Sequence, residues 1–171
     1  MTRIGLLSDT HSYFDPRFNE LFAHCDEIWH AGDIGDMQVL NDMRALKPTR
    51  AVYGNIDDSR IRAELKETLR FTCDGVDVWI THIGGYPNKY APAVKTLIYN
   101  KPPQLFIAGH SHILKVIYDK KINCLHINPG AAGRSGFHSV RTAVRFTLDN
   151  GEIKDLEIIE LNKSEIANTY P

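Results

Sequence analysis

The stretch that decides the fold is Ile4-Gly5-Leu6-Leu7-Ser8-Asp9-Thr10-His11, near the start of the 171-residue chain. It begins as an apolar run, which predicts a short buried strand over residues 3–8. The run ends abruptly in the carboxylate of Asp9 and the imidazole of His11. Because open α/β folds bind ligands at the carboxyl ends of their strands, this stretch predicts a site at the edge of a sheet.

Four later strands are expected to end in polar clusters of the same kind. The clusters are Gly32-Asp33, Gly54-Asn55-Ile56-Asp57, His82 and Gly109-His110-Ser111-His112. With the first stretch they supply seven candidate metal ligands: Asp9, His11, Asp33, Asn55, His82, His110 and His112. Two carboxylates, one amide oxygen and four imidazoles are more than one metal ion needs. They therefore predict two ions that share a bridging carboxylate.

Helical and strand-like patterns alternate over the first 57 residues. Strands over 3–8, 27–31 and 50–53 are separated by a helix that begins at Asp15-Pro16 and by a helix over 36–46. This order implies parallel strands with right-handed crossovers. Gly32, Gly54 and Gly109 are expected to let the backbone turn sharply beside the crowded site without a Cβ clash.

The later part of the chain is richer in strands. Residues 58–66 are expected to form a short exposed helix or loop, 68–73 and 76–81 a hairpin, 83–86 a loop and 93–99 a helix. Further strands are expected over 105–108, 114–118, 123–127, 140–148 and 152–160. The pattern predicts an α/β fold in which two sheets pack together with helices outside. We expect a single domain over 1–171, with a polar, frayed tail from about residue 162 to 171.

The composition is that of an ordinary soluble domain. A formal net charge of −1 argues against general nucleic-acid or anionic-membrane binding. Three isolated cysteines are typical of reduced core thiols. No secretory leader and no apolar run of about 20 residues is recognisable, so we expect a cytoplasmic protein with no membrane segment. The oligomeric state is left open, and a homo-oligomer is compatible with the sequence.

The five polar clusters, in this order at strand ends, closely resemble the motifs of the calcineurin-like metallophosphoesterases. The length and the early spacing are similar to the small, single-domain, YfcE-like prokaryotic phosphodiesterases. The resemblance covers residues 4 to about 135. It implies a four-layer α/β/β/α sandwich of two packed mixed sheets, in agreement with the two-sheet pattern.

The resemblance also implies a role for each ligand. Asp9, His11 and His112 would bind one metal ion, Asn55, His82 and His110 the other, and Asp33 would bridge the two. Asp33, Asn55 and His82 would act in catalysis through a hydroxide shared by the ions, which attacks phosphorus in line and needs no covalent intermediate. Asp57 is expected to orient its loop instead of binding metal. Mn²⁺ is favoured by the resemblance, although Ni²⁺, Fe, Co²⁺ and Zn²⁺ also suit these ligands.

One position departs from the family pattern. Larger relatives carry histidine after the Gly-Asn pair, where it can protonate the leaving group, but this chain has Ile56. A positioned acid contributes about 10²–10⁴-fold on a poor leaving group. We therefore expect phosphodiesters or activated aryl esters to be better substrates than simple alkyl phosphates.

Other polar residues have simpler interpretations. His30 is expected to point into the protein or to orient a ligand, and His126 to be structural. Asp36 is interpreted as a helix N-cap. Arg134 and His138 lie in a loop that can approach the site, where a guanidinium suits phosphate, but an exposed loop arginine is the simpler interpretation.

The leading function is a dinuclear metal-dependent phosphoesterase acting on a small phosphodiester. A phosphomonoesterase for a small phosphorylated metabolite is the enzymatic alternative. A non-catalytic scaffold that binds proteins is the alternative from another class, since a retromer subunit has this fold. The complete ligand set favours an enzyme.

Overall fold

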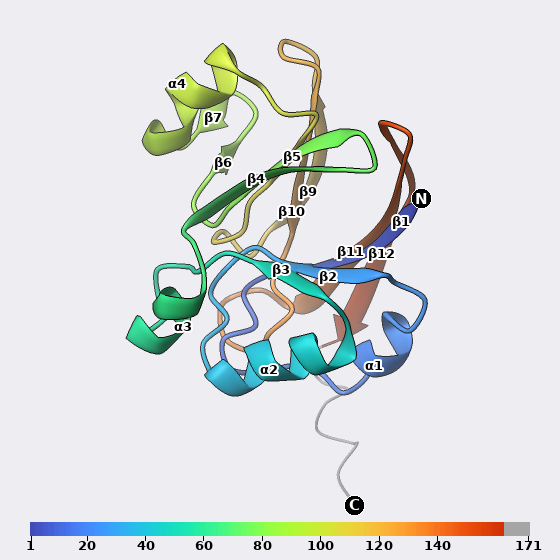
Figure 1. Ribbon diagram of the computed structural model, residues 1–171. Helices are drawn as coiled ribbons and strands as arrows, with labels where there is room; N and C mark the ends of the chain where they lie inside the picture. The colour runs from blue at the N-terminus through green and yellow to red at the C-terminus, as the bar shows by residue number, and fades with distance from the viewer. Residues whose placement is uncertain (163–171) are drawn as a thin grey trace, which may run out of the picture.

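Two five-stranded mixed sheets pack face to face in the computed structural model, which describes residues 1–162 (Figure 1). The first sheet contains β12 (Glu152–Asn162), β11 (Val140–Asp149), β1 (Thr2–Leu7), β2 (Glu27–His30) and β3 (Thr49–Ala51), in that order. The second contains β4 (Thr68–Cys73), β5 (Val76–Thr81), β8 (Leu105–Ile107), β10 (Cys124–Pro129) and β9 (Leu114–Asp119). The predicted frayed tail lies, after Asn162, outside the described residues.

Three consecutive strands of each sheet are parallel. β1, β2 and β3 run parallel in the first sheet, and β5, β8 and β10 do so in the second. An antiparallel neighbour, β11, lies beside β1 in the first sheet, and the second parallel set has one on each side, β4 beside β5 and β9 beside β10. The predicted β-α-β-α-β start and the later antiparallel strands are therefore confirmed.

Helices cover the outer faces of the two sheets. α1 (Phe18–Leu21) and α2 (Met37–Leu46) lie on the first sheet, and α4 (Pro92–Asn100) lies on the second (Figure 1). Along β1, Ile4 and Leu6 face the other sheet, whereas Leu7 faces the helices. Gly5 also faces the helices, and a Cβ there would lie 2.7 Å from the Phe22 ring. This four-layer α/β/β/α sandwich confirms the expected fold.

Two local predictions were wrong. The first helix does not begin at Asp15-Pro16, since residues 16–17 form a turn that precedes it. The Asp15 carboxylate still accepts the Arg17 N–H at 2.9 Å, as a capping side chain does, and also pairs with Arg141, 2.7 Å away. The helix starts only at Phe18. The segment after His82 is not merely a loop, since β6 (Gly85–Tyr86) and β7 (Lys89–Tyr90) form a small hairpin.

Other details agree with the sequence. Residues 59–64 form α3 (Ser59–Glu64), which is capped by the Asp58 side chain. The Asp36 side chain caps α2 by accepting the Gln38 N–H, as predicted. The three cysteines are buried and free. Within residues 1–162, no helix is long and apolar enough to cross a bilayer.

Candidate metal centre

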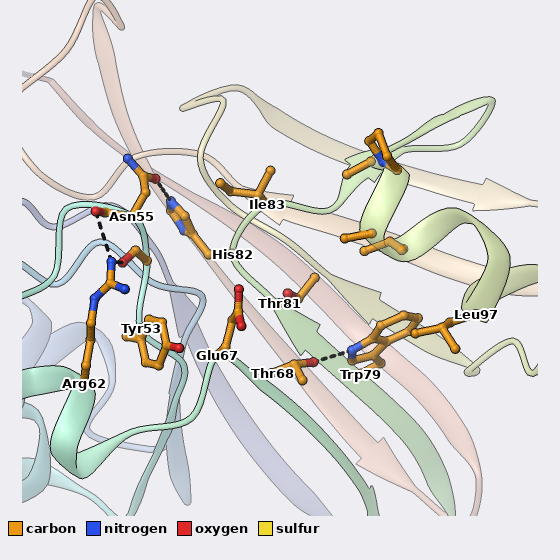
Figure 2. Close-up of a pocket in the computed structure, with 15 residues that line it drawn as sticks. Tyr53, Asn55, Arg62, Glu67, Thr68, Trp79, Thr81, His82, Ile83 and Leu97 are labelled. Atoms are coloured by element: carbon orange, nitrogen blue, oxygen red, sulfur yellow. Dashed lines mark hydrogen bonds between the residues drawn. The ribbon is translucent and has the colours of Figure 1, made fainter.

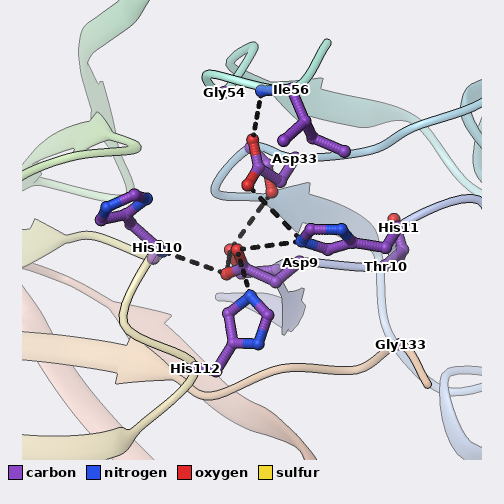
Figure 3. A network of polar contacts seen from close by, with 12 residues as sticks. Asp9, Thr10, His11, Asp33, Gly54, Ile56, His110, His112 and Gly133 are labelled. Carbon is purple, nitrogen blue, oxygen red and sulfur yellow. Dashed lines mark hydrogen bonds and ion pairs between the residues drawn. The ribbon is translucent and has the colours of Figure 1, made fainter. Parts of the chain in front are cut away.

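The polar clusters that follow the strands meet at one end of the two sheets (Figure 3). Backbone hydrogen bonds continue beyond the strands and hold the loops together. Asp9 N–H donates to the Gly32 carbonyl at 3.0 Å, and His11 N–H donates to the Asp33 carbonyl at 3.1 Å. In the second sheet, beyond the ends of β8 and β5, Gly109 N–H donates to the carbonyl of His82 at 2.9 Å. The scaffold therefore fixes the backbone from which the candidate ligands project.

One group of candidate ligands gathers around Asp9. His112 Nε2 lies 3.2 Å from Asp9 Oδ1, and His11 Nε2 lies 3.9 Å from the same oxygen. The other carboxylate oxygen, Asp9 Oδ2, accepts from Ser8 Oγ at 2.6 Å and from the His110 N–H at 3.1 Å. These two donors leave Oδ1 directed toward the imidazoles.

The second group gathers around His82. Its Nε2 lies 3.1 Å from Asp33 Oδ2 and 3.0 Å from Asn55 Oδ1. His110 Nδ1 lies 3.0 Å from the same Asn55 oxygen. Asp33 Oδ2 is also 3.5 Å from His11 Nε2, which belongs to the first group. Asp33 Oδ2 thus lies within 3.5 Å of one imidazole from each group.

The donor atoms suit metal ions. Asp9 Oδ1 and His11 Nε2 are buried and have no hydrogen-bond partner within residues 1–162. A metal that binds nitrogen and oxygen at about 2.0–2.2 Å places neighbouring ligand atoms about 3 Å apart. Several contacts in both groups have this spacing. The atoms of Asp9, His11 and His112 all lie within 4.8 Å of one another, as do those of Asp33, His82 and His110.

The His82 ring shows why a cation is needed. Its Nδ1 lies 2.8 Å from the Ala31 carbonyl, which can only accept, so Nδ1 carries a proton. In the neutral ring, the Nε2 lone pair then faces the oxygens of Asp33 and Asn55. These atoms repel unless a proton or a metal ion lies among them.

When no metal ion is bound, protons on the imidazoles supply part of the positive charge that the ligand oxygens need. Burial alone would raise the pKa of Asp9, but its contacts with His11 and His112 hold that pKa far below the usual range. Burial likewise opposes a lowered pKa at Asp33, but His82 outweighs it. The pKa of His11 is raised chiefly by Asp9. The carboxylates are therefore ionised and face imidazoles, and a divalent ion can bind there by displacing the imidazole protons.

Backbone strain is concentrated in the ligand loops. Left-handed φ angles, which non-glycine residues rarely adopt, occur at Asp9 (54°), His11 (44°), Asp33 (58°), His110 (72°) and His112 (60°). All five are Asp or His, which adopt this region more often than most non-glycine residues do, although the strand-end pattern did not predict it. The hydrogen bonds between loops hold these conformations in place.

The two predicted roles of the site glycines, a sharp turn and the avoidance of a Cβ clash, fall on different positions. Gly32 has a positive φ of 99°, as a sharp turn requires. Gly54 and Gly109 do not, but a Cβ at Gly54 would lie 2.1 Å from Asp33 Oδ1, and one at Gly109 2.2 Å from Ser8 Oγ. These two positions exclude a Cβ because other chain atoms approach closely.

A second imidazole orients His112. His138 Nε2 lies 2.8 Å from the Gly133 carbonyl, so it donates and leaves Nδ1 as an acceptor in the neutral ring. His112 Nδ1 lies 3.3 Å from His138 Nδ1 and donates to it. The lone pair of His112 is then on Nε2, which faces Asp9. His138 was weighed only as a loop residue near the site.

The loop after β3 is held from both sides. Asp57 accepts the Gly35 N–H at 2.8 Å and the Gly54 N–H at 2.7 Å, so its contacts agree with an orienting role. Arg62 Nε donates to the Asp57 carbonyl at 2.7 Å. The Ile56 N–H donates to Asp33 Oδ1 at 3.1 Å, while its side chain is 45% exposed and offers no proton.

The remaining predicted histidines lie in the protein interior. His30 is buried, with Nε2 3.0 Å from Thr10 Oγ1 and Nδ1 accepting the Gly32 N–H at 3.0 Å. Burial lowers its pKa to about 4, so it is neutral. His126 is also buried and neutral, with a pKa of about 4. Arg134 lies over the Tyr13 ring at 3.8 Å.

Residues 2–151 match the model of the calcineurin-like phosphoesterase superfamily domain. The chain belongs to this superfamily. A probable metallophosphoesterase of Methanocaldococcus jannaschii is 31% identical over 137 residues, which are 75% of this chain and 67% of that protein. A probable metallophosphoesterase of Methanothermobacter thermautotrophicus is 26% identical over 135 residues, covering 75% and 76% of the two chains. Family membership implies a metal-dependent phosphoesterase that uses divalent ions.

Solved structures of other proteins share the fold. An archaeal phosphodiesterase superposes with a TM-score of 0.73 at 22% identity, covering 93% of this chain and 99% of that one. A single mutant of Vps29 from Entamoeba histolytica gives a TM-score of 0.72 at 16% identity, covering 94% and 99%. At these identities the likeness establishes the fold alone.

Proposed function

We propose that the chain is a dinuclear phosphoesterase that prefers phosphodiesters. The observation that carries this proposal is the position of Asp33 Oδ2, 3.1 Å from His82 Nε2 and 3.5 Å from His11 Nε2. One carboxylate oxygen is thereby available to both ligand groups. Asp9, His11 and His112 would hold one ion, and Asn55, His82 and His110 the other. Mn²⁺ is the ion that we propose.

Two bound ions would activate a water molecule and neutralise charge on the phosphoryl oxygens. The chain supplies the geometry. Asp33 is held through Oδ1 by the Ile56 N–H, so that Oδ2 is free to face both groups. His82 is held by the Ala31 carbonyl, and Asp57 fixes the loop that presents Asn55. Such prior orientation avoids reorganisation during the reaction.

The preference for diesters is supported by what surrounds the centre. The exposed Ile56 side chain cannot protonate an alkoxide, so substrates with good leaving groups are favoured. A protein-binding scaffold remains the second candidate, because Vps29 shares the fold. The ligand groups favour the enzyme, since two buried ligand atoms without hydrogen-bond partners serve no purpose in a scaffold.

The test is metal analysis followed by hydrolysis of bis-p-nitrophenyl phosphate and p-nitrophenyl phosphate. We expect two divalent ions per chain and faster hydrolysis of the diester. Asp33→Asn should reduce both metal content and rate by more than the roughly 10–100-fold that loss of an outer partner costs. Asp42→Asn, which alters an exposed carboxylate on α2, is the matched control. Fewer than one bound ion and no hydrolysis of either ester would refute the proposal.

A further inference from the structure

A cavity of about 580 Å³ adjoins the metal centre between the loop after β3 and helix α4 (Figure 2). Asn55 and His82 line one end, and Leu97 on α4 lines the other. Cavities of about 300–1,000 Å³ accommodate small organic molecules. A methyl or ethyl ester group would leave most of this space empty.

The wall on the α4 side is apolar. Ile83, Pro92 and Leu97 contribute to it, and Ile83 and Leu97 remain 48% and 58% exposed. Single exposed apolar side chains are ordinary, but several that line one concave surface beside a reactive centre favour binding of an apolar group. Trp79 forms part of the floor, where its Nε1–H donates to Thr68 Oγ1 at 2.5 Å.

Charge divides the cavity into two ends. Arg62 lies near the metal centre, where it donates to the carbonyls of Asp57, Gly54 and Asn55. Its charge is not neutralised by a carboxylate within residues 1–162. The Glu67 carboxylate projects into the middle of the cavity (Figure 2) and has no hydrogen bond or ion pair with any described residue. The end beyond Glu67 therefore disfavours a second anionic group.

We infer that this cavity binds the organic ester group of the substrate: an uncharged ring system, either aryl or nucleoside, attached to the phosphoryl group at the metal centre. The inference rests on the proposed phosphoesterase function and names its substrate class. A ring presents apolar faces to Ile83 and Leu97, and an amino or hydroxyl group at its edge donates to Glu67. A bare sugar does not match the apolar wall, and a terminal phosphate would face the Glu67 carboxylate.

The test measures binding to the metal-loaded chain by calorimetry, so that it does not depend on turnover. The ring-free probes are inorganic phosphate and methylphosphonate, and the ring-containing probes are phenylphosphonate and thymidine monophosphate. We expect the ring-containing probes to bind at least about 10-fold more tightly, as apolar contact in a pocket provides. The two ring probes distinguish an aryl group from a nucleoside.

Two variants on α4 locate the effect. Leu97→Asp places a charge on the apolar wall and should remove the preference for rings while leaving the affinity for inorganic phosphate within about 2-fold. Thr96→Asp adds the same charge at an exposed neighbour that does not line the cavity, and should change neither affinity. Glu67→Gln should weaken thymidine monophosphate more than phenylphosphonate, because only the base has N–H donors.

Equal affinities of wild-type protein for methylphosphonate and phenylphosphonate would overturn the inference. So would a Leu97→Asp variant that loses phosphate and phenylphosphonate binding to the same extent. Failure of the proposed function gives a different result, namely ring-selective binding in a metal-loaded chain that hydrolyses no ester.

Discussion

Asp9 is fully buried, and two donors hold its Oδ2 atom, whereas Asn55 is exposed at the mouth of a 580 Å³ cavity. The Asp9 side of the centre is enclosed by the 130–138 segment, where Gly133 N–H donates to the Asp9 carbonyl at 3.0 Å. On the Asn55 side, the candidate ligands Asn55 and His82 line the cavity directly. The enclosed side is suited to holding an ion, and the open side to admitting a substrate.

The enclosed side depends on a buried ion pair. Arg141 is fully buried, and its Nη2 donates to Asp15 Oδ2 at 2.7 Å. Its Nη1 donates to the Ala132 carbonyl at 3.2 Å, next to the Gly133 segment that covers Asp9. Asp15→Asn would leave the guanidinium charge buried without a carboxylate. We expect a loss of about 3–5 kcal/mol in the free energy of unfolding, measured by urea denaturation.

The comparison for this variant is Glu157→Gln, which removes an exposed partner of Arg145 and should change stability by less than about 1 kcal/mol. Acid provides a second check. Although burial opposes it, pairing with Arg17 and Arg141 lowers the pKa of Asp15 to about 2. The contribution of these ion pairs to the free energy of unfolding is therefore present above about pH 4 and is lost as the pH falls toward about 2. An Asp15→Asn variant with wild-type stability and acid sensitivity would contradict this account.

His138 tests whether the enclosed side holds its ion through an oriented imidazole. His138→Ala removes the acceptor for His112 Nδ1 and frees that ring to change tautomer. We expect the affinity for one of two ions to fall about 10–100-fold, and the other to remain. Competition with a chelator measures both affinities. If His138 had a merely structural role, its loss would lower the affinity for both ions together.

A matched pair of variants supports that measurement. His138→Gln retains a donor for the Gly133 carbonyl and an acceptor for His112, so it should recover most of the lost affinity. His24→Ala changes an exposed histidine away from the site and should have no effect. If alanine and glutamine at position 138 bind both ions as wild type does, the orienting role is wrong.

The sequence revealed the candidate ligands because their signal is local. Asp9 and His11 follow an apolar strand within the chain, and parallel strands bring such ends together. The contact between His112 and His138 spans 26 positions and depends on the path of a loop with no periodic pattern. The cavity was equally hidden, since it depends on how far α4 lies from the loop after β3. The residue types therefore indicated the metal chemistry. The hydrogen bond that supports His112 and the cavity that admits a substrate depend on how the folded elements are spaced, which the residue types do not show.

Ile56 tests the open side, with the smallest expected effect. Its backbone N–H, not its side chain, holds Asp33, so Ile56→His should leave the metal ligands in place. A neighbouring imidazolium can protonate an alkoxide leaving group. The p-nitrophenolate leaving group is stable as an anion and does not require this proton. We expect about a 10-fold gain in kcat for a diester with an alkyl leaving group, below the 10²–10⁴-fold of a fully positioned acid.

The gain should be selective in both substrate and pH. Hydrolysis of bis-p-nitrophenyl phosphate should be unchanged, and the gain on the alkyl ester should decline above about pH 6.5 as the histidine loses its proton. Ile56→Asn, which is polar but cannot titrate, separates acid catalysis from a change in polarity. An equal gain with asparagine would mean that access to the open side limits the reaction, whereas no gain with histidine would show that the leaving group departs without protonation.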